Sequence, residues 1–241
     1  VSGAGFININ RLSMITGSSI DKTTNSSFNP NTGELNPFII SENPNAIVQV
    51  IGKDVFDKNG NAVAYNLAID ATDIQYADLI SRVIKISGNI IGSDNTEVNI
   101  KTGNDKAEYD KNNKNLTVTS KDTNTNNNTN NNQTKPEFAV DSTVFGGIQA
   151  GRINFIATED GLAVRTRSDL IATVDDINFD VDGNIIIEEG SLYANNNINI
   201  ESKQYKTNNN SQNTTNNPTG VSIKNSNIIT NNDDLNIKSN S

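Results

Sequence analysis

Short segments in which apolar and polar residues alternate recur along this chain, and their spacing constrains the fold more than any other feature. A triplet of an apolar residue, Asn and a second apolar residue begins at five positions: Val98, Ile153, Ile177, Ile198 and Leu235. From Ile153 onwards the starts lie 24, 21 and 37 residues apart, and the last interval becomes 21 without the 16-residue polar tract 203–218. Alternation indicates strands, and a period in the low twenties is typical of stacked coils.

We therefore predict an all-β fold, a parallel β-solenoid in which each coil contributes one strand to each parallel sheet. Leucine-rich repeats have a similar period, but their leucine framework is missing here. Only 34% of the residues are hydrophobic, which suits a narrow apolar interior. Asn at the same position of successive coils is expected to form a ladder of side-chain hydrogen bonds. The chain length without its polar tracts predicts about nine coils.

Two tracts of low complexity, 111–134 and 203–218, consist mainly of Asn, Thr, Lys and Ser. Such segments bury too little apolar surface to offset the entropy lost on ordering. We expect both to be disordered inserts extruded from the coils. In the segment 73–86 the apolar residues have partial helical spacing, so a helix is the alternative there, but strands are the preferred prediction.

The chain contains neither Cys nor His and has a net charge of −9. Disulfides, thiol chemistry, imidazole bases and His-ligated metal sites are therefore excluded within it. The acidic balance disfavours attraction to nucleic acid and to anionic membrane surfaces, and no apolar run approaches the roughly 18 residues of a membrane span. We predict no enzymatic activity, no cofactor, no metal, no nucleic-acid partner and no membrane insertion.

Two charged patterns have a functional alternative. The first has the spacing of a calcium loop: Asn178, Asp180, Asp182, Gly183 and Glu189. The second supplies the arginines and carboxylate that a β-helical polysaccharide lyase requires: Arg152, Arg165, Arg167 and Asp169. We interpret the first as an alternating strand followed by a turn, and the second as a solvated face whose charges pair across coils.

Three longer segments carry a family resemblance. They are GAGFININRLSMITGS at 3–18, DATDIQYADLISRVIKISGNI at 70–90, and KPEFAVDSTVFGGIQAGRINFIATEDGLAVRTRSDLIA at 135–172. In this order they resemble the secretion domain of two-partner-secretion exoproteins. That domain is the haemagglutination activity domain of filamentous haemagglutinins, large haemolysins and contact-dependent inhibition proteins. The matching positions are Gly3, Gly5, Phe6, Asn8, Asp78, Leu79, Arg82, Asp141, Gly146, Gly147, Ala150, Gly151, Ile153, Thr158 and Gly161.

The resemblance implies a right-handed, single-stranded parallel β-helix that is exported through the periplasm of a Gram-negative bacterium to the cell surface or medium. It also implies recognition by an outer-membrane transporter of the TpsB/Omp85 type, through its POTRA domains, and a role in nucleating the fold of the following stem. Residues 1–172 would form the secretion domain without its N-terminal cap, and residues 173–241 the start of the stem. The family's Asn-Pro-Asn markers would precede Val1, and Ala163 stands where the family usually has Gly.

Two other functions stay open at this stage. The same fold is used by carbohydrate-active enzymes, and the long polar surface suits direct binding to a host-cell or neighbouring-cell receptor. Exoproteins of this family include adhesins, haemolysins and toxin-delivery stems. The residues that would separate these activities are not among those given in this sequence.

Overall fold

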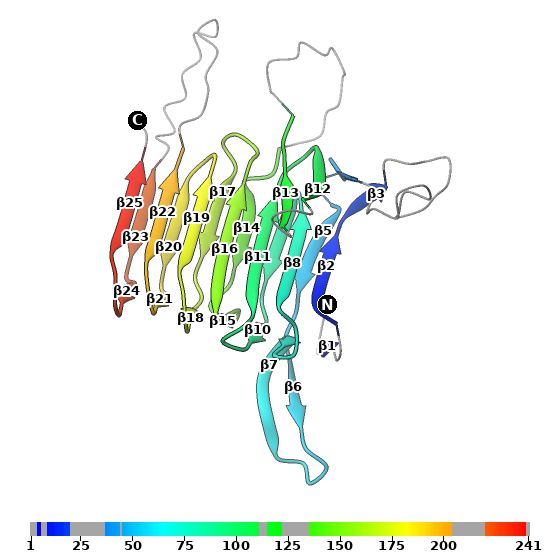
Figure 1. Cartoon of the computed structure of the whole chain (residues 1–241), viewed down its shortest axis with the longest axis vertical. Coiled ribbons are helices and arrows are strands. Elements are labelled where there is room, and N and C mark those ends of the chain that lie inside the picture. The colour runs from blue at the N-terminus through cyan, green and yellow to red at the C-terminus, as the bar shows by residue number, and fades with distance from the viewer. Residues whose placement is uncertain are drawn as a thin grey trace, which may run out of the picture.

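A computed structural model describes residues 4–5, 9–19, 37–43, 45–110, 115–121, 135–203 and 220–239. All the regular elements assigned to these residues are strands, so the all-β prediction is confirmed (Figure 1). The described part of the chain therefore offers no helix that could cross a membrane.

Most strands belong to three parallel sheets, which we call sheets I, II and III. Sheet I contains, in spatial order, β1 (Ala4–Gly5), β7 (Ala62–Ala71), β10 (Asn89–Gly92), β15 (Ile148–Ala150), β18 (Leu170–Ala172), β21 (Ser191–Ala194) and β24 (Asn227–Thr230). Sheet II contains β2 (Arg11–Ile15), β8 (Tyr76–Ser81), β11 (Glu97–Thr102), β16 (Arg152–Ala157), β19 (Ile177–Val181), β22 (Ile198–Ser202) and β25 (Leu235–Ser239). Sheet III contains β5 (Ile47–Val50), β9 (Val83–Ile86), β14 (Phe138–Ser142), β17 (Ala163–Thr166), β20 (Ile185–Glu188) and β23 (Val221–Lys224).

The chain visits the three sheets in a fixed rotation. From β7 onwards it passes from sheet I to sheet II to sheet III and back to sheet I, and each new strand pairs in parallel with the strand laid down one rotation earlier. We call one such set of three strands a rung. Figure 1 shows the rungs side by side, running from the blue N-terminal strands to the red C-terminal ones.

The register between rungs follows the repeat seen in the sequence. In sheet II, Ile153 pairs with Ile177, Ile177 with Ile198 and Ile198 with Leu235. The interval of 37 residues is absorbed between β22 and β23, so the spacing argument is confirmed. The prediction of about nine coils is wrong, because sheet II has seven strands. Part of the chain counted toward coils lies instead in a hairpin and in a separate antiparallel sheet.

The interior between the sheets is narrow and apolar. On β16 the side chains of Ile153, Phe155 and Ala157 are buried, while Asn154 lies on the outer face, as the alternation predicts. Phe155 and Phe179 stack in register, with ring centroids 4.7 Å apart and planes 3° from parallel. The segment 73–86 forms β8 and β9, so strands and not a helix are confirmed there.

An antiparallel sheet, here called the cover sheet, lies over the outer face of sheet II near its N-terminal end. It consists of β3 (Gly17–Ser19), β4 (Phe38–Ile40), β12 (Lys106–Asp110) and β13 (Asn115–Val118). Its apolar side chains enclose Ile80 of β8 in a second small core with Ile40, Ala107, Leu116 and Val118. The prediction of a disordered insert at 111–134 is therefore wrong for 115–118. Residues 111–114, 122–134 and 204–218 lie outside the described residues.

The extra segments enter the rungs at particular places. β3 and β4 lie between β2 of sheet II and β5 of sheet III, and β12 and β13 lie between β11 of sheet II and β14 of sheet III. In the order of the chain, the tract 203–218 also falls between a strand of sheet II, β22, and a strand of sheet III, β23. One exception, strand β6 (Lys53–Phe56), pairs with β7 in an antiparallel hairpin that projects beyond the rungs (Figure 1).

The stacked rings make the interior sensitive to loss of volume. Replacing Phe155 with Ala removes one ring of the pair and leaves a cavity in a narrow core, so we expect the free energy of unfolding to fall by about 3–5 kcal/mol. Urea unfolding followed by circular dichroism measures the loss. The exposed Phe145 provides the matched control, and Phe145→Ala should change stability by no more than about 0.5 kcal/mol. Equal losses in the two variants would contradict the assignment of Phe155 to the core.

Candidate functional site

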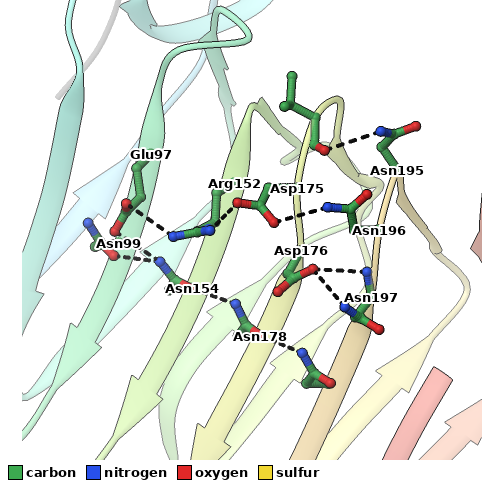
Figure 2. Close-up of polar contacts among 12 residues, drawn as sticks. Glu97, Asn99, Arg152, Asn154, Asp175, Asp176, Asn178, Asn195, Asn196 and Asn197 are labelled. Atoms are coloured by element: carbon green, nitrogen blue, oxygen red, sulfur yellow. Dashed lines mark hydrogen bonds and ion pairs between the residues drawn. The ribbon is translucent and has the colours of Figure 1, made fainter. Parts of the chain in front are cut away.

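The most extensive polar feature is a ladder of Asn side chains on the outer face of sheet II (Figure 2). Each Asn donates its Nδ2 hydrogen to the side-chain oxygen one rung earlier. The donor–acceptor distances are 2.9 Å from Asn154 to Asn99, 2.9 Å from Asn178 to Asn154, 2.8 Å from Asn199 to Asn178 and 2.9 Å from Asn236 to Asn199. These are the Asn residues of the repeated triplet, so the predicted ladder is confirmed.

The ladder begins at a buried carboxylate. Asp78 on β8 is 0% exposed and accepts hydrogen bonds from Arg11 at 2.5 Å, from Ser13 at 2.9 Å and from Asn99 at 3.0 Å. The guanidinium of Arg11 also lies 4.2 Å from the centre of the Tyr76 ring. A buried charge is tolerated only when it is paired and hydrogen-bonded. Arg11 supplies the opposite charge here, and all three donors come from the adjacent strands β2 and β11.

A second polar row follows the corner where the chain passes from sheet I to sheet II (Figure 2). Arg152 pairs with Asp175 one rung later, and lies 3.9 Å from Glu97 one rung earlier. Asn196 donates to Asp175 at 3.4 Å, while the backbone N–H of Asn197 donates to the carboxylate of Asp176 at 2.9 Å. Every one of these bonds joins successive rungs.

A buried ion pair joins two of the connections in which the chain passes from sheet II to sheet III. Arg82, between β8 and β9, donates to both carboxylate oxygens of Glu159 at 2.8 and 2.7 Å, and to the carbonyl of Glu42 at 2.5 Å. Arg82 is 9% exposed and Glu159 is 4% exposed. The hydrogen bond from Arg82 to Glu159 raises the pKa of the guanidinium above its usual value. The guanidinium therefore stays charged, and the pair joins two segments 77 residues apart.

A further ion pair lies on the outer face of sheet III. Arg165 on β17 donates to both oxygens of Asp141 on β14, at 2.9 and 3.0 Å, and stacks 4.2 Å above the centre of the Phe138 ring. Arg167 lies 3.9 Å from the same carboxylate. The predicted pairing of charges between rungs is confirmed for Arg152, Arg165 and Arg167, whereas Asp169 accepts a hydrogen bond from the backbone N–H of Ser191. Arg152 and Arg165 lie on different sheets, so the structure does not bring the arginines of a lyase site together.

Several of the described residues that carry the family resemblance make contacts between rungs. Asp78 begins the ladder, Arg82 forms the buried ion pair, and Asp141 holds Arg165. Thr158 donates its hydroxyl to the carbonyl of Thr102 one rung earlier, at 3.1 Å. Three others point into the interior and are buried: Leu79, Ala150 and Ile153. Gly5 lies on β1, where it pairs with Asp70, and Gly3, Phe6 and Asn8 lie outside the described residues.

Two signature glycines show why a side chain does not fit. A Cβ atom on Gly151 would lie 2.0 Å from the carbonyl oxygen of Asp94, because adjacent rungs approach closely at this corner. Gly161 has a φ of +72°, a conformation that residues with a Cβ adopt at a cost. The remaining pair, Gly146 and Gly147, forms the turn between β14 and β15.

The segment with the spacing of a calcium loop, from Asn178 to Glu189, spans two strands and the turn between them. Asn178 belongs to the ladder, Asp180 pairs with Lys203, and the Asp182-Gly183 turn connects β19 to β20. The interpretation as an alternating strand and a turn is confirmed. Within the described ranges, no three acidic side chains lie close enough to hold a metal ion.

The burial of Lys101 was not predicted from the sequence. Lys101 on β11 is 1% exposed beneath the cover sheet, where its Nζ donates to the side-chain oxygen of Asn115 at 2.6 Å and to the carbonyl of Leu116 at 2.5 Å. Burial lowers the pKa of Lys101 below its usual value. Its position in an alternating strand placed it on the outer face, which is solvated in the rungs that the cover sheet does not reach.

Comparison with known proteins gives two relatives over most of this chain. No family model and no solved structure matches it. The Toxin CdiA of Yersinia pestis is 27% identical over 190 residues, which is 79% of this chain and 4% of the relative. The tRNA nuclease CdiA-2 of Burkholderia pseudomallei is 22% identical over 187 residues, which is 78% of this chain and 5% of the relative. The chain thus spans about one-twentieth of the length of each.

These relatives correct one prediction. The composition led to the expectation that the protein has no enzymatic activity. One relative is named as a nuclease and the other as a toxin, so that expectation is wrong as a description of the proteins to which this chain is similar. The absence of His and Cys limits the chemistry of these 241 residues only.

The buried ion pair should dominate the stability of the N-terminal rungs. Replacing Arg82 with Met leaves the Glu159 carboxylate buried without its partner, and we expect the free energy of unfolding to fall by about 3–5 kcal/mol. Urea unfolding measures this loss. The double variant Arg82→Met with Glu159→Leu removes both charges and should recover most of it. A single variant as stable as the wild type would contradict the buried pair.

The pKa of Lys101 predicts a pH dependence. A lysine whose folded-state pKa lies below its unfolded-state pKa binds fewer protons when folded, so stability rises with pH between the two values. We expect the wild type to gain stability relative to Lys101→Met as the pH increases from neutral through the folded-state pKa toward about 10.4, the unperturbed value. Urea unfolding of both proteins at matched pH values tests this. A constant difference between them would show that Lys101 is not desolvated.

Proposed function

We propose that this chain is the secretion and folding module of a long, exported protein. The observation that carries the proposal is the coincidence of two facts. Residues that carry the family resemblance in two distant segments, Asp78 and Arg82 in one and Asp141 in the other, form ion pairs between rungs, and the chain matches CdiA proteins over 79% of its own length but 4% of the Yersinia pestis protein. A small module at which a much longer chain begins to fold has these properties.

We infer that the three parallel sheets form a right-handed, single-stranded β-helix. The fixed rotation of strands through the sheets supports this, since each strand pairs with the strand one rotation earlier. A strand, crossover and parallel strand within one sheet is right-handed in about 98% of known cases. The seven strands of sheet II would span about 30 Å along the axis at the usual spacing between strands.

We assign residues 1–172 to the secretion domain and 173–241 to the first rungs of a stem. The three ion-paired signature residues, Asp78, Arg82 and Asp141, all lie in the first assigned region. Beyond Ala172 the contacts between rungs are mainly repeated ones, namely the Asn ladder and the corner bonds of Asp175 and Asp176. The first region would therefore fold as the nucleus, and the second would extend it.

The proposed route and partner follow from the same similarity. The protein would cross the periplasm of a Gram-negative bacterium and be recognised there by the POTRA domains of an outer-membrane transporter of the two-partner type. It would then act at the cell surface on a neighbouring cell. Because the relatives are named as a toxin and a tRNA nuclease, we propose that the longer protein delivers a toxin activity of this kind.

Secretion through a two-partner transporter tests the proposal. The 241-residue chain, given a periplasmic export signal, is produced in a Gram-negative host with or without a two-partner transporter. We expect folded chain in the medium only when the transporter is present. The variant Arg82→Met should be secreted less, since its nucleus is destabilised, and Lys238→Ala in the last strand should match the wild type. Equal amounts in the medium with and without the transporter would overturn the proposal.

A further inference from the structure

We infer that Asp78 sets the direction of the Asn ladder, and with it the end at which further rungs can be added. An Asn side chain presents a donor on one side and an acceptor on the other, so a ladder of Asn residues can run in either of two directions. In this protein all of them run the same way. Every Nδ2 points toward the N-terminal rungs, from Asn236 through to Asn99.

The carboxylate at the start accounts for this uniform direction. An ionised carboxylate accepts hydrogen bonds and cannot donate one. Asn99 must therefore turn its Nδ2 toward Asp78, which leaves its oxygen facing Asn154. Asn154 must then donate toward Asn99, and the same choice is imposed on each later rung. The side chain of Asp78 is held ready by Arg11 and Ser13 on the preceding strand.

The two edges of sheet II are consequently different. On the N-terminal side, Ser13 occupies the ladder position and its hydroxyl is already directed at Asp78. On the C-terminal side, Asn236 has its Nδ2 directed at Asn199, so its oxygen faces the edge at which the next strand would pair. An added rung with Asn in register can donate to that oxygen and continue the ladder. The ladder thus accepts growth at the β25 edge and ends at the β2 edge.

The contribution of Asp78 extends beyond the residues it touches. If the direction of the hydrogen bonds is transmitted along the ladder, a substitution at residue 78 must alter the loss of stability caused by a substitution several rungs away. Asp78 and Asn178 lie on β8 and β19, three strand spacings or about 14 Å apart, beyond the range of direct hydrogen bonding. Sites this far apart without shared partners ordinarily have additive effects on stability. The inference concerns the folding of the chain alone and does not depend on the proposed secretion.

Replacing Asn178 with Asp provides the test. A carboxylate at 178 can accept from Asn199 but cannot donate to Asn154, so one hydrogen bond is lost while Asp78 holds the earlier residues in their direction. With Asp78→Asn also present, Asn154, Asn99 and residue 78 can all reverse and direct their donors toward residue 178. All variants carry Glu97→Gln, because Glu97 accepts from Asn154 and a Gln bonds to either orientation.

Urea unfolding at pH 7 measures the folded-to-unfolded ratio of these variants. We expect Asn178→Asp to lower the ratio about tenfold when Asp78 is present, and less than about threefold when the chain also carries Asp78→Asn. Asn178→Ala is the matched control and should lower the ratio equally in both backgrounds. Repeating the series in 1 M salt, where the Debye length is about 3 Å, weakens any repulsion that acts through solvent between the two carboxylates.

Equal losses from Asn178→Asp in both backgrounds would overturn the inference, as would a rescue that disappears in 1 M salt. Asn236→Asp gives a second site if Asn178→Asp does not fold. Residue 236 is on the exposed edge strand, where the loss of one bond leaves the interior intact. The loss of stability caused by Asn236→Asp is then compared between chains with Asp78 and chains with Asp78→Asn. A smaller loss in the second background would show that Asp78 sets the direction along the whole ladder.

Discussion

Everything in this structure depends on the parallel, in-register pairing of each strand with the strand one rung earlier. Parallel pairing at a fixed repeat places like residues beside like, about 4.8 Å apart. Phe155 therefore stacks on Phe179, and Asn154 bonds to Asn178. An interior only one or two side chains wide is sufficient, since each rung is covered on both sides by its neighbours. This explains how a chain that is 34% hydrophobic buries a continuous core.

The rungs differ in how they are held together. Near the N-terminal end, buried charges are neutralised by specific partners, as in Arg11 with Asp78 and Arg82 with Glu159. Such pairs tolerate little change, because losing one partner leaves the other charged and desolvated. Toward the C-terminal end the contacts are neutral amide bonds that repeat from rung to rung. The specific, unrepeated contacts therefore lie where the stack begins, and the repeated contacts lie where it continues.

The structural features that depend on local periodicity could be predicted from the sequence. The strands, the register of the triplets and the placement of Ile153 and Asn154 on opposite faces follow from alternation and spacing. The ion pair of Arg82 and Glu159 could not be found in this way, since a separation of 77 residues carries no period. The cover sheet was missed because the Leu116–Val118 pattern lies inside an Asn-rich tract. The burial of Lys101 could not be predicted either, because the outer face of β11 is covered only by that sheet.

The connections from sheet II to sheet III can take up extra chain without disturbing the stack of rungs. Three of them carry extra chain, yet the register on either side is unchanged: Ile198 still pairs with Leu235 across a 37-residue interval. Closing a longer loop adds little entropy cost, about 0.6 kcal/mol for each doubling of its length. Lineages could therefore exchange, lengthen or delete whatever this corner displays while the scaffold beneath it stays the same. Such variation would leave the number of rungs and their pairing unaltered.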